Sequence, residues 1–225
     1  MNSQPSKSEP AAARSPEGRR QRRSAQIREL LFRSALDLFA KKGFAETTVE
    51  DITNAADVGK GTFFNYFPSK DHILVAFGEM QLGKLEAAIG EARRSNQSIR
   101  EFLQSLGPRM TQEPTRNPGL IRTLLQAYLS TTPVRQAMVD LQKRVQELHT
   151  QIIERGQERG EIRRDLPAAE IAMVFRQTIF GTLLIWSLYG DASLLSRMET
   201  SFQVLWTGLQ PSISQQAEIS GGDSS

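Results

Sequence analysis

The residues best suited to chemistry lie between Lys60 and Lys70, in the run KGTFFNYFPSK. Its lysines supply cationic donors, Thr62 and Tyr66 supply hydroxyl groups, and the phenylalanines supply flat apolar faces. Cations and hydroxyl groups bind phosphate oxygens, and apolar groups contact thymine methyl groups in the major groove of DNA. Lys60 also stands in the first turn of an expected helix, where the helix dipole favours an anionic partner nearby. The run therefore predicts binding to nucleic acid.

Two short helices are predicted to position this run. Thr48 is followed three residues later by Asp51, a spacing typical of a capping box, so the first helix should begin near Thr48. Asp57-Val58-Gly59 interrupts the helical pattern. A second helix is expected from Lys60 to Phe67, with Phe63 and Phe67 on one face. Two such helices form a helix-turn-helix, which fits a major groove about 12 Å wide.

This stretch resembles the tetracycline-repressor-like (TetR) family of bacterial transcription regulators. The family's usual signature is T-T/S-V-x-D-I followed by G-V-S-K-G-T-F/L-Y-x-Y/H-F-x-S/N-K, and the matching run here is TTVEDITNAADVGKGTFFNYFPSK. The resemblance is strong over about residues 25 to 75 and elsewhere rests on length and helical character. It implies an all-α homodimeric regulator, most often a repressor, that binds a palindromic double-stranded operator and releases it when a small-molecule effector fills a C-terminal pocket.

The resemblance also implies roles for individual residues in DNA binding. Thr48 and Lys70 should hold phosphates, and Phe64 should touch a thymine methyl group or a sugar. The residues expected to approach bases or the adjacent backbone are Lys60, Gly61, Thr62, Asn65 and Tyr66. The family often has tyrosine where this chain has Phe64, so the phosphate hydrogen bond of that phenol is missing here.

Length and composition exclude several other classes of protein. The chain has 225 residues, no cysteine and a net charge of +3, so disulfides, thiolate metal sites and a cysteine nucleophile are ruled out. The N-terminus is polar and unlike a secretory signal, and the apolar run from Thr178 to Tyr189 is shorter than the about 20 residues that a membrane helix needs. We therefore expect a soluble cytoplasmic protein without a membrane partner.

Catalysis and cofactor binding find little support. His72 and His149 are far apart and lack a second ligand at metal spacing, so both are expected to be exposed helix residues and no metal site is predicted. Gly59-Lys60-Gly61 lacks the later glycine and the preceding strand of a nucleotide-binding loop, so no cofactor is expected. A non-enzymatic regulator is favoured. An effector-independent DNA-binding protein of the same fold and an enzyme using the C-terminal cavity remain alternatives.

The expected organisation begins with a disordered basic arm over residues 1–22 and a helix-turn-helix domain over residues 23–70. This domain should begin with a helix from about Ser24 to Lys42 that ends at Gly43. Its small core is expected to consist of Leu31, Leu38, Phe39, Phe44, Val49, Ile52, Val58, Phe63 and Phe67. The arginines of the arm could lie along phosphates or in a minor groove, or could form a solvated face.

Residues 71–210 should form a helical bundle for ligand binding and dimerisation, followed by a polar tail over 211–225, which gives about nine helices in all. An irregular loop is expected around Pro108. The helix ending near Arg94 contains Gly78, Gly83 and Gly90, which either pack against bulky neighbours or make this helix bendable. The remaining helices are expected over about residues 98–106, 118–131, 133–160, 167–189 and 193–209.

The last two of these helices carry more apolar surface than one small bundle can cover, which favours a two-fold partner. In the resembled family the last two helices form the dimer interface. The family's pocket would lie between the helices expected over residues 71 to about 189, and the residues placed to line it are Phe77, Met80, Phe102, Leu106, Leu124, Tyr128, Phe175, Arg176 and Ile179. Arg176 stands in an apolar helix and could pair across a dimer, reach solvent or bind an acidic effector, and we favour a structural role.

Overall fold

The computed structural model describes residues 16–111, 118–129, 135–190 and 193–211 of the chain. Within these residues the regular structure consists of nine helices and no strand, which confirms the all-α prediction. The chain divides into two compact units, Met1–Lys70 and Asp71–Ser225, and each is described by itself.

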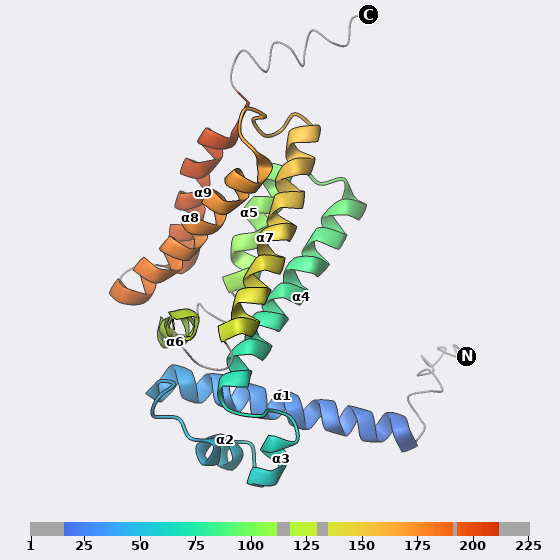
Figure 1. Cartoon of the computed structure of the whole chain (residues 1–225), viewed down its shortest axis with the longest axis vertical. Coiled ribbons are helices and arrows are strands. Elements are labelled where there is room, and N and C mark those ends of the chain that lie inside the picture. The colour runs from blue at the N-terminus through green and yellow to red at the C-terminus, as the bar shows by residue number, and fades with distance from the viewer. Residues whose placement is uncertain (1–15, 112–117, 130–134, 191–192, 212–225) are drawn as a thin grey trace, which may run out of the picture. The chain divides into compact units, whose positions relative to one another are not determined.

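The first unit contains α1 (Pro16–Lys42), α2 (Val49–Ala55) and α3 (Lys60–Phe64) (Figure 1). Helix α1 begins at Pro16 rather than Ser24, so residues 16–22 are helical and the expectation of disorder was wrong for them. Proline fits the first helical turn, and arginine and glutamine are good helix formers. The rest of the predicted arm, residues 1–15, lies outside the described residues.

The capping signals of this unit act as the sequence predicts. Gly43 ends α1 with a φ of 86°, and Thr48 caps α2 with the reciprocal bonds of a capping box. The break between α2 and α3 passes through Asp57, whose φ of 51° lies in the left-handed region that aspartate tolerates better than most residues. Helix α3 ends at Phe64, and a turn carries the chain on to Phe67.

The predicted core of this unit is only partly right. Leu31, Phe39, Ile52, Phe63 and Phe67 are buried as expected. Leu38, Phe44, Val49 and Val58 are only half-buried, whereas Phe32 and Leu36 are buried although they were not predicted. A helix can bury more than one stripe of side chains, and the apolar period of α1 does not show how wide its covered face is.

The second unit consists of α4 (Asp71–Ser95), α5 (Ile99–Thr111), α6 (Pro118–Leu129), α7 (Arg135–Glu158), α8 (Ala168–Tyr189) and α9 (Leu194–Leu209). Helix α8 packs against both α7 and α9 (Figure 1). Helix α5 continues through Pro108 to Thr111, so the irregular loop expected around Pro108 is absent there. Pro108 lies in the last turn of α5 with its ring exposed, so it interrupts the backbone hydrogen bonds only near the end of the helix.

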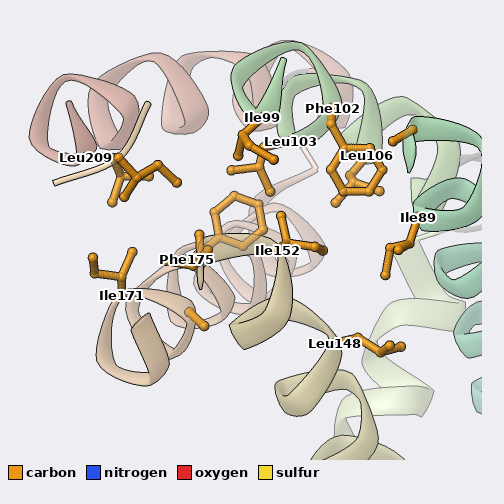
Figure 2. Packing of buried hydrophobic residues seen from close by; sticks show 14 of the residues in the cluster. Ile89, Ile99, Phe102, Leu103, Leu106, Leu148, Ile152, Ile171, Phe175 and Leu209 are labelled. Atoms are coloured by element: carbon orange, nitrogen blue, oxygen red, sulfur yellow. The ribbon is translucent and has the colours of Figure 1, made fainter. Parts of the chain in front are cut away.

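The core of the second unit joins α4, α5, α7, α8 and α9. Figure 2 shows Ile99, Phe102 and Leu103 of α5 with Phe175 of α8 and Ile152 of α7 in this cluster. Each buried side chain of this size contributes about 1.5 to 3 kcal/mol to the free energy of unfolding. Gly156 permits close packing here, since a Cβ atom at this position would lie 2.6 Å from Ile162 Cδ1.

Helix α8 corrects the expectation about membrane-spanning segments. Its 22 residues are long and apolar enough to cross a membrane by length and composition, because the apolar character continues before Thr178 on the other side of Arg176 and Gln177. A core helix of a helical bundle has the same character. Only 28% of its most apolar window is buried, so much of its apolar surface is open in one chain.

Candidate DNA-binding surface and ligand cavity

Helix α3 is anchored on one side and open on the other. Phe63 is fully buried and Phe67 is 2% exposed, so the two aromatic rings fix the helix against the first unit. Phe64 is 55% exposed, and Lys60, Gly61 and Asn65 are also exposed. Thr62 and Tyr66 are half-buried. The predicted base-reading residues therefore lie on or at the edge of the open face of α3.

Lys60 forms an ion pair with α2. Its Nζ atom lies 2.8 Å from Glu50 Oε2, and both side chains are more than half exposed. An exposed pair of this kind contributes between 0 and about 1 kcal/mol, because water screens both charges. A phosphate group could therefore replace Glu50 as the partner of Lys60 at little cost.

Thr48 is committed to the cap of α2. Its Oγ1 atom donates to Asp51 Oδ2 at 2.7 Å and accepts from the Asp51 amide at 3.1 Å. The Thr48 amide donates to the same carboxylate oxygen at 2.8 Å, and Lys42 Nζ lies 2.6 Å from it. The hydrogen bond from Lys42, followed by those from Thr48, holds the pKa of Asp51 well below its usual range. The phosphate contact expected from Thr48 stays a prediction.

Lys70 makes its contacts inside the first unit. Its ammonium group donates to the carbonyl oxygens of Phe44 at 2.8 Å, Ala45 at 3.2 Å and Thr47 at 2.8 Å. It also lies 4.5 Å from the centre of the Phe44 ring. These bonds fix the segment that joins α1 to α2. Lys70 is thus a structural residue in this conformation, and its phosphate contact stays a prediction.

The second unit contains a cavity of about 510 Å³ between α4, α5, α6, α7, α8 and α9. This volume falls within the range typical of small-molecule sites, about 300 to 1,000 Å³. A second cavity of about 290 Å³ adjoins it, and the two share Gly107, Ile179 and Met198.

The predicted pocket residues fall into three groups. Those that line the larger cavity are Phe77, Leu106, Leu124, Arg176 and Ile179. Phe102 belongs to the core cluster (Figure 2), and Phe175 lines the smaller cavity. Met80 lines neither cavity, and the side chain of Tyr128 lies outside the described residues.

Residues of α7 make up a wall that was missed from the sequence. Met138, Gln142, Val145 and His149 line the cavity at spacings of three and four residues. Helical periodicity of α7 could have identified this face, although not that it borders a cavity. The methionines along the described lining are Met110, Met138, Met173 and Met198.

Arg176 connects α8 to α7 at the cavity wall. Its Nη1 atom donates to Gln146 Oε1 at 2.8 Å, and its Nη2 atom donates to Gln142 Oε1. The arginine is half-buried. Both of these acceptors are neutral amide oxygens.

His149 is buried, and the expectation that it is exposed was wrong. Its side chain is packed beside Phe175 at a ring distance of 5.5 Å, and Nδ1 lies 2.9 Å from the Val145 carbonyl oxygen. Burial lowers the pKa of His149 to about 4, opposed by the bond to Val145 and reinforced by the nearby charge of Arg176. The imidazole is therefore neutral near pH 7, and Nδ1 carries the hydrogen that bonds Val145.

The three glycines of α4 have different surroundings. A Cβ atom on Gly78 would lie 2.8 Å from Leu141 Cδ1, so this glycine allows close packing of α4 on α7. Gly83 has no heavy atom of the described residues within 4 Å of such a Cβ, and Gly90 has only the Arg94 side chain at 3.6 Å. Close packing therefore requires a glycine at Gly78, whereas the described surroundings of Gly83 leave room for a side chain.

Comparison with known proteins finds two family domains in the chain. Residues 31–77 match the family model for bacterial regulatory proteins of the tetR family, and residues 110–202 match that for the tetracyclin repressor-like C-terminal domain. The HTH-type transcriptional repressor KstR of Mycobacterium tuberculosis is 24% identical over 159 residues, 71% of this chain and 70% of that protein. The HTH-type transcriptional regulator TcmR of Streptomyces glaucescens is 41% identical over 73 residues, 31% of this chain and 32% of that protein.

Solved structures show the same fold. The TetR-family repressor FadR of Thermus thermophilus, solved in complex with lauroyl-CoA, is 29% identical with a TM-score of 0.62 and covers 80% of this chain and 94% of its own. FadR of Bacillus subtilis has a TM-score of 0.70 at 19% identity and covers 81% of this chain and 99% of its own. With a helix-turn-helix in the first unit and a helical domain with a cavity in the second, this chain belongs to the TetR family and is a ligand-responsive, DNA-binding transcriptional regulator.

Proposed function

We propose that this protein is a cytoplasmic homodimeric repressor that binds a palindromic operator and releases it when a small molecule occupies the cavity of the second unit. The observation that carries the DNA-binding part is the amphipathic α3, which buries Phe63 and Phe67 while Phe64 and Lys60 face outward. The DNA-binding domain would comprise residues 23–70, and the ligand-binding and dimerisation domain residues 71–210.

Contacts with DNA would come from three places in the first unit. Lys60, Gly61, Thr62, Asn65 and Tyr66 approach bases or the adjacent backbone, Phe64 contacts a thymine methyl group or sugar, and Thr48 and Lys70 hold phosphates. The helical start of α1 adds exposed cationic side chains, which are Arg19, Arg20 and Arg23. Cationic side chains in the DNA-binding unit strengthen DNA binding, because the phosphates that they neutralise release their counterions.

The exposed apolar surface of α8 and α9 supports the dimer. Val174, Ile185 and Leu188 of α8 are 47%, 45% and 59% exposed, and Leu195 and Val204 of α9 are 43% and 72% exposed. Apolar side chains gathered on two neighbouring helices mark an interaction surface, and a two-fold axis lets the same surface serve both partners. Two recognition helices about 34 to 36 Å apart would then reach successive major grooves.

The cavity supports control by a ligand. An effector weakens operator binding only by the difference in its affinity for the two conformations of the protein, and the ligand and the operator affect one another reciprocally. The FadR of Thermus thermophilus, which was solved with lauroyl-CoA, supports a ligand-binding role. In this proposal ligand binding weakens operator binding, so the effector releases the protein from DNA rather than recruiting it.

Selection of bound sequences from random DNA tests the proposal. We expect a palindrome whose half-sites are about one or more helical turns apart, and light scattering should give the mass of two chains for the free protein. Recovery of no consensus, or of a single half-site bound by a monomer, would contradict it. Titration of small molecules against the bound operator then separates a ligand-released repressor from an effector-independent DNA-binding protein.

A further inference from the structure

The larger cavity borders long stretches of α7 and α8. Its lining runs from Met138 to His149 along α7 and from Met173 to Leu183 along α8. At a rise of about 1.5 Å per residue, these segments measure roughly 16 and 15 Å. The cavity is therefore long enough along these helices to take an extended molecule.

The described lining of the larger cavity is mostly apolar and carries a single positive charge. Among the described residues that line the cavity, Arg176 alone is charged at neutral pH, since these residues include neither aspartate nor glutamate and His149 is neutral. The other polar side chains along this lining are the amides of Gln81, Gln142 and Gln177. A cationic ligand would be repelled here, whereas an anionic group would be attracted to a guanidinium in a medium of low polarity.

A carboxylate could replace the two glutamine oxygens as the hydrogen-bond acceptor of Arg176. The two terminal guanidinium nitrogens of Arg176 donate to the side-chain oxygens of Gln142 and Gln146. Both acceptors are neutral, and the two donors lie in the plane of one guanidinium group. A carboxylate offers two charged oxygens in the same arrangement, and charge-assisted pairs of this kind are roughly twice as strong as neutral hydrogen bonds. Rotation of either glutamine side chain leaves the backbone hydrogen bonds of α7 intact, but rotation of Gln146 breaks the bonds of its Nε2 atom to the Ala169 carbonyl oxygen at 3.0 Å and to Thr150 Oγ1 at 3.4 Å.

The apolar part of the cavity lies mostly to one side of Arg176. Arg176 is three residues from the Met173 end of the α8 lining and seven from the Leu183 end, so roughly 10 Å of cavity extends toward Leu183. The residues along this part include Phe77, Leu124, Met138, Leu141 and Phe180. Methionines in such a wall adjust to tails of different shape.

We propose that the effector is an elongated amphipathic carboxylate whose head binds Arg176 in place of the two glutamines and whose apolar tail extends toward Met138 and Leu183. This inference rests on the proposed function for the consequence of binding, because the carboxylate must favour the conformation that does not bind the operator. Binding itself concerns the second unit only.

The test compares ligands that share one tail on the full-length protein without DNA. Isothermal titration calorimetry is carried out with decanoic acid, 1-decanol and decyltrimethylammonium, the two ionic probes below their critical micelle concentrations and the alcohol below its solubility limit. We expect decanoate to bind about 10-fold or more tightly than decanol, and the cation to show no binding. Equal affinity for the three probes would overturn the proposal, because binding would then depend on the tail alone.

Variants of arginine locate the head group. Arg176→Gln should weaken decanoate binding by about 10- to 100-fold and leave decanol binding within about 2- to 3-fold. Arg176→Lys keeps the charge without the planar fork and should lose part of the affinity. Arg144→Gln is the matched control, since Arg144 is 58% exposed on the adjacent α7 and does not line the cavity. Decanoate binding that is unchanged in a folded Arg176→Gln protein would overturn the proposal.

A third comparison separates a free acid from its thioester. Decanoyl-CoA carries the same tail but has a thioester in place of the carboxylate, and its negative charges lie on phosphates at the far end of the coenzyme. The proposal therefore expects it to bind more weakly than decanoate and to lose less affinity than decanoate in Arg176→Gln. Tighter binding of the thioester than of the acid would overturn the carboxylate head. If decanoate binds through Arg176 yet leaves the operator complex intact, the proposed release mechanism fails while this binding site stands.

Discussion

The ammonium group of Lys70 lies 2.8 Å from the carbonyl oxygen of Thr47, the residue that precedes the cap of α2. Together with the bonds to Phe44 and Ala45, this contact joins the end of the first unit to the segment that precedes α2 and α3. A lysine that motif comparison assigns to a phosphate therefore also maintains the shape of the domain.

Substitution Lys70→Met tests that structural role. Three carbonyl oxygens lose their donor, so we expect the free energy of unfolding to fall by about 1 to 3 kcal/mol, together with weaker operator binding. Urea denaturation followed by circular dichroism measures the first effect. Lys60→Met is the control, because it removes only an exposed ion pair and should lower operator affinity with a change in stability below about 0.5 kcal/mol. Weaker DNA binding at full stability in Lys70→Met would instead assign the residue to phosphate binding alone.

A reciprocal exchange of hydroxyl groups tests the open face of α3. Tyr66→Phe removes a donor near the expected backbone contact and should weaken operator binding by about 0.5 to 1.5 kcal/mol, whereas Phe64→Tyr adds a donor on an exposed ring and should strengthen it by a similar amount. Fluorescence anisotropy with a labelled operator measures both. Neither change should alter the mass found by light scattering. No change of affinity in either variant would show that α3 does not meet DNA through this face.

The basic start of α1 predicts an extra electrostatic contribution to DNA binding. Replacement of Arg19, Arg20 and Arg23 by glutamine should make the slope of log K against log salt concentration less negative by about 0.9 for each phosphate that is no longer neutralised. Glutamine keeps a side chain that suits a helix. Arg93 and Arg94 at the end of α4 are exposed as well and provide the control double substitution. An unchanged slope would leave these arginines as a solvated face.

Gly83 tests whether α4 has to bend during release. Gly83→Ala introduces a Cβ atom with no described neighbour within 4 Å and should stabilise the helix by about 1 kcal/mol. If bending of α4 accompanies release, the variant needs a higher effector concentration to free the operator while its affinity for DNA without effector is retained. Gly78→Ala is read together with it, since its Cβ meets Leu141 and it tests packing as well. If the effector concentration that releases the operator is unchanged in both variants, bending of α4 is not part of release.

The buried imidazole of His149 predicts how stability depends on pH. The pKa of His149 is about 4 in the folded chain against 6.5 when unperturbed, so between these values the unfolded chain binds the proton and the folded chain does not. Stability is then constant above about pH 6.5 and falls by up to roughly 3 kcal/mol as the pH drops to about 4. Thermal unfolding from about pH 7.5 to about pH 4 measures the fall, which His149→Gln should reduce and His72→Gln should not.

The sequence by itself determined the local features of this protein. The cap at Thr48, the stop at Gly43 and the face shared by Phe63 and Phe67 depend on residues within a few positions of one another, so they follow from short spacings. The same spacings carry the resemblance to the TetR family, which is why the DNA-reading residues could be named before the fold was known.

Tertiary structure alone decided which residues meet across long distances in the chain. Phe102 and Leu106 lie one turn apart on α5 and both belong to the core cluster, yet only Leu106 also lines the larger cavity. Likewise, the burial of His149 and the bonds of Arg176 to Gln142 and Gln146 arise from how α7 and α8 pack. Apolar periodicity shows which face of a helix is turned inward, but not whether neighbouring side chains fill the space beside it or leave a cavity, because apolar residues recur at the same spacing in both cases.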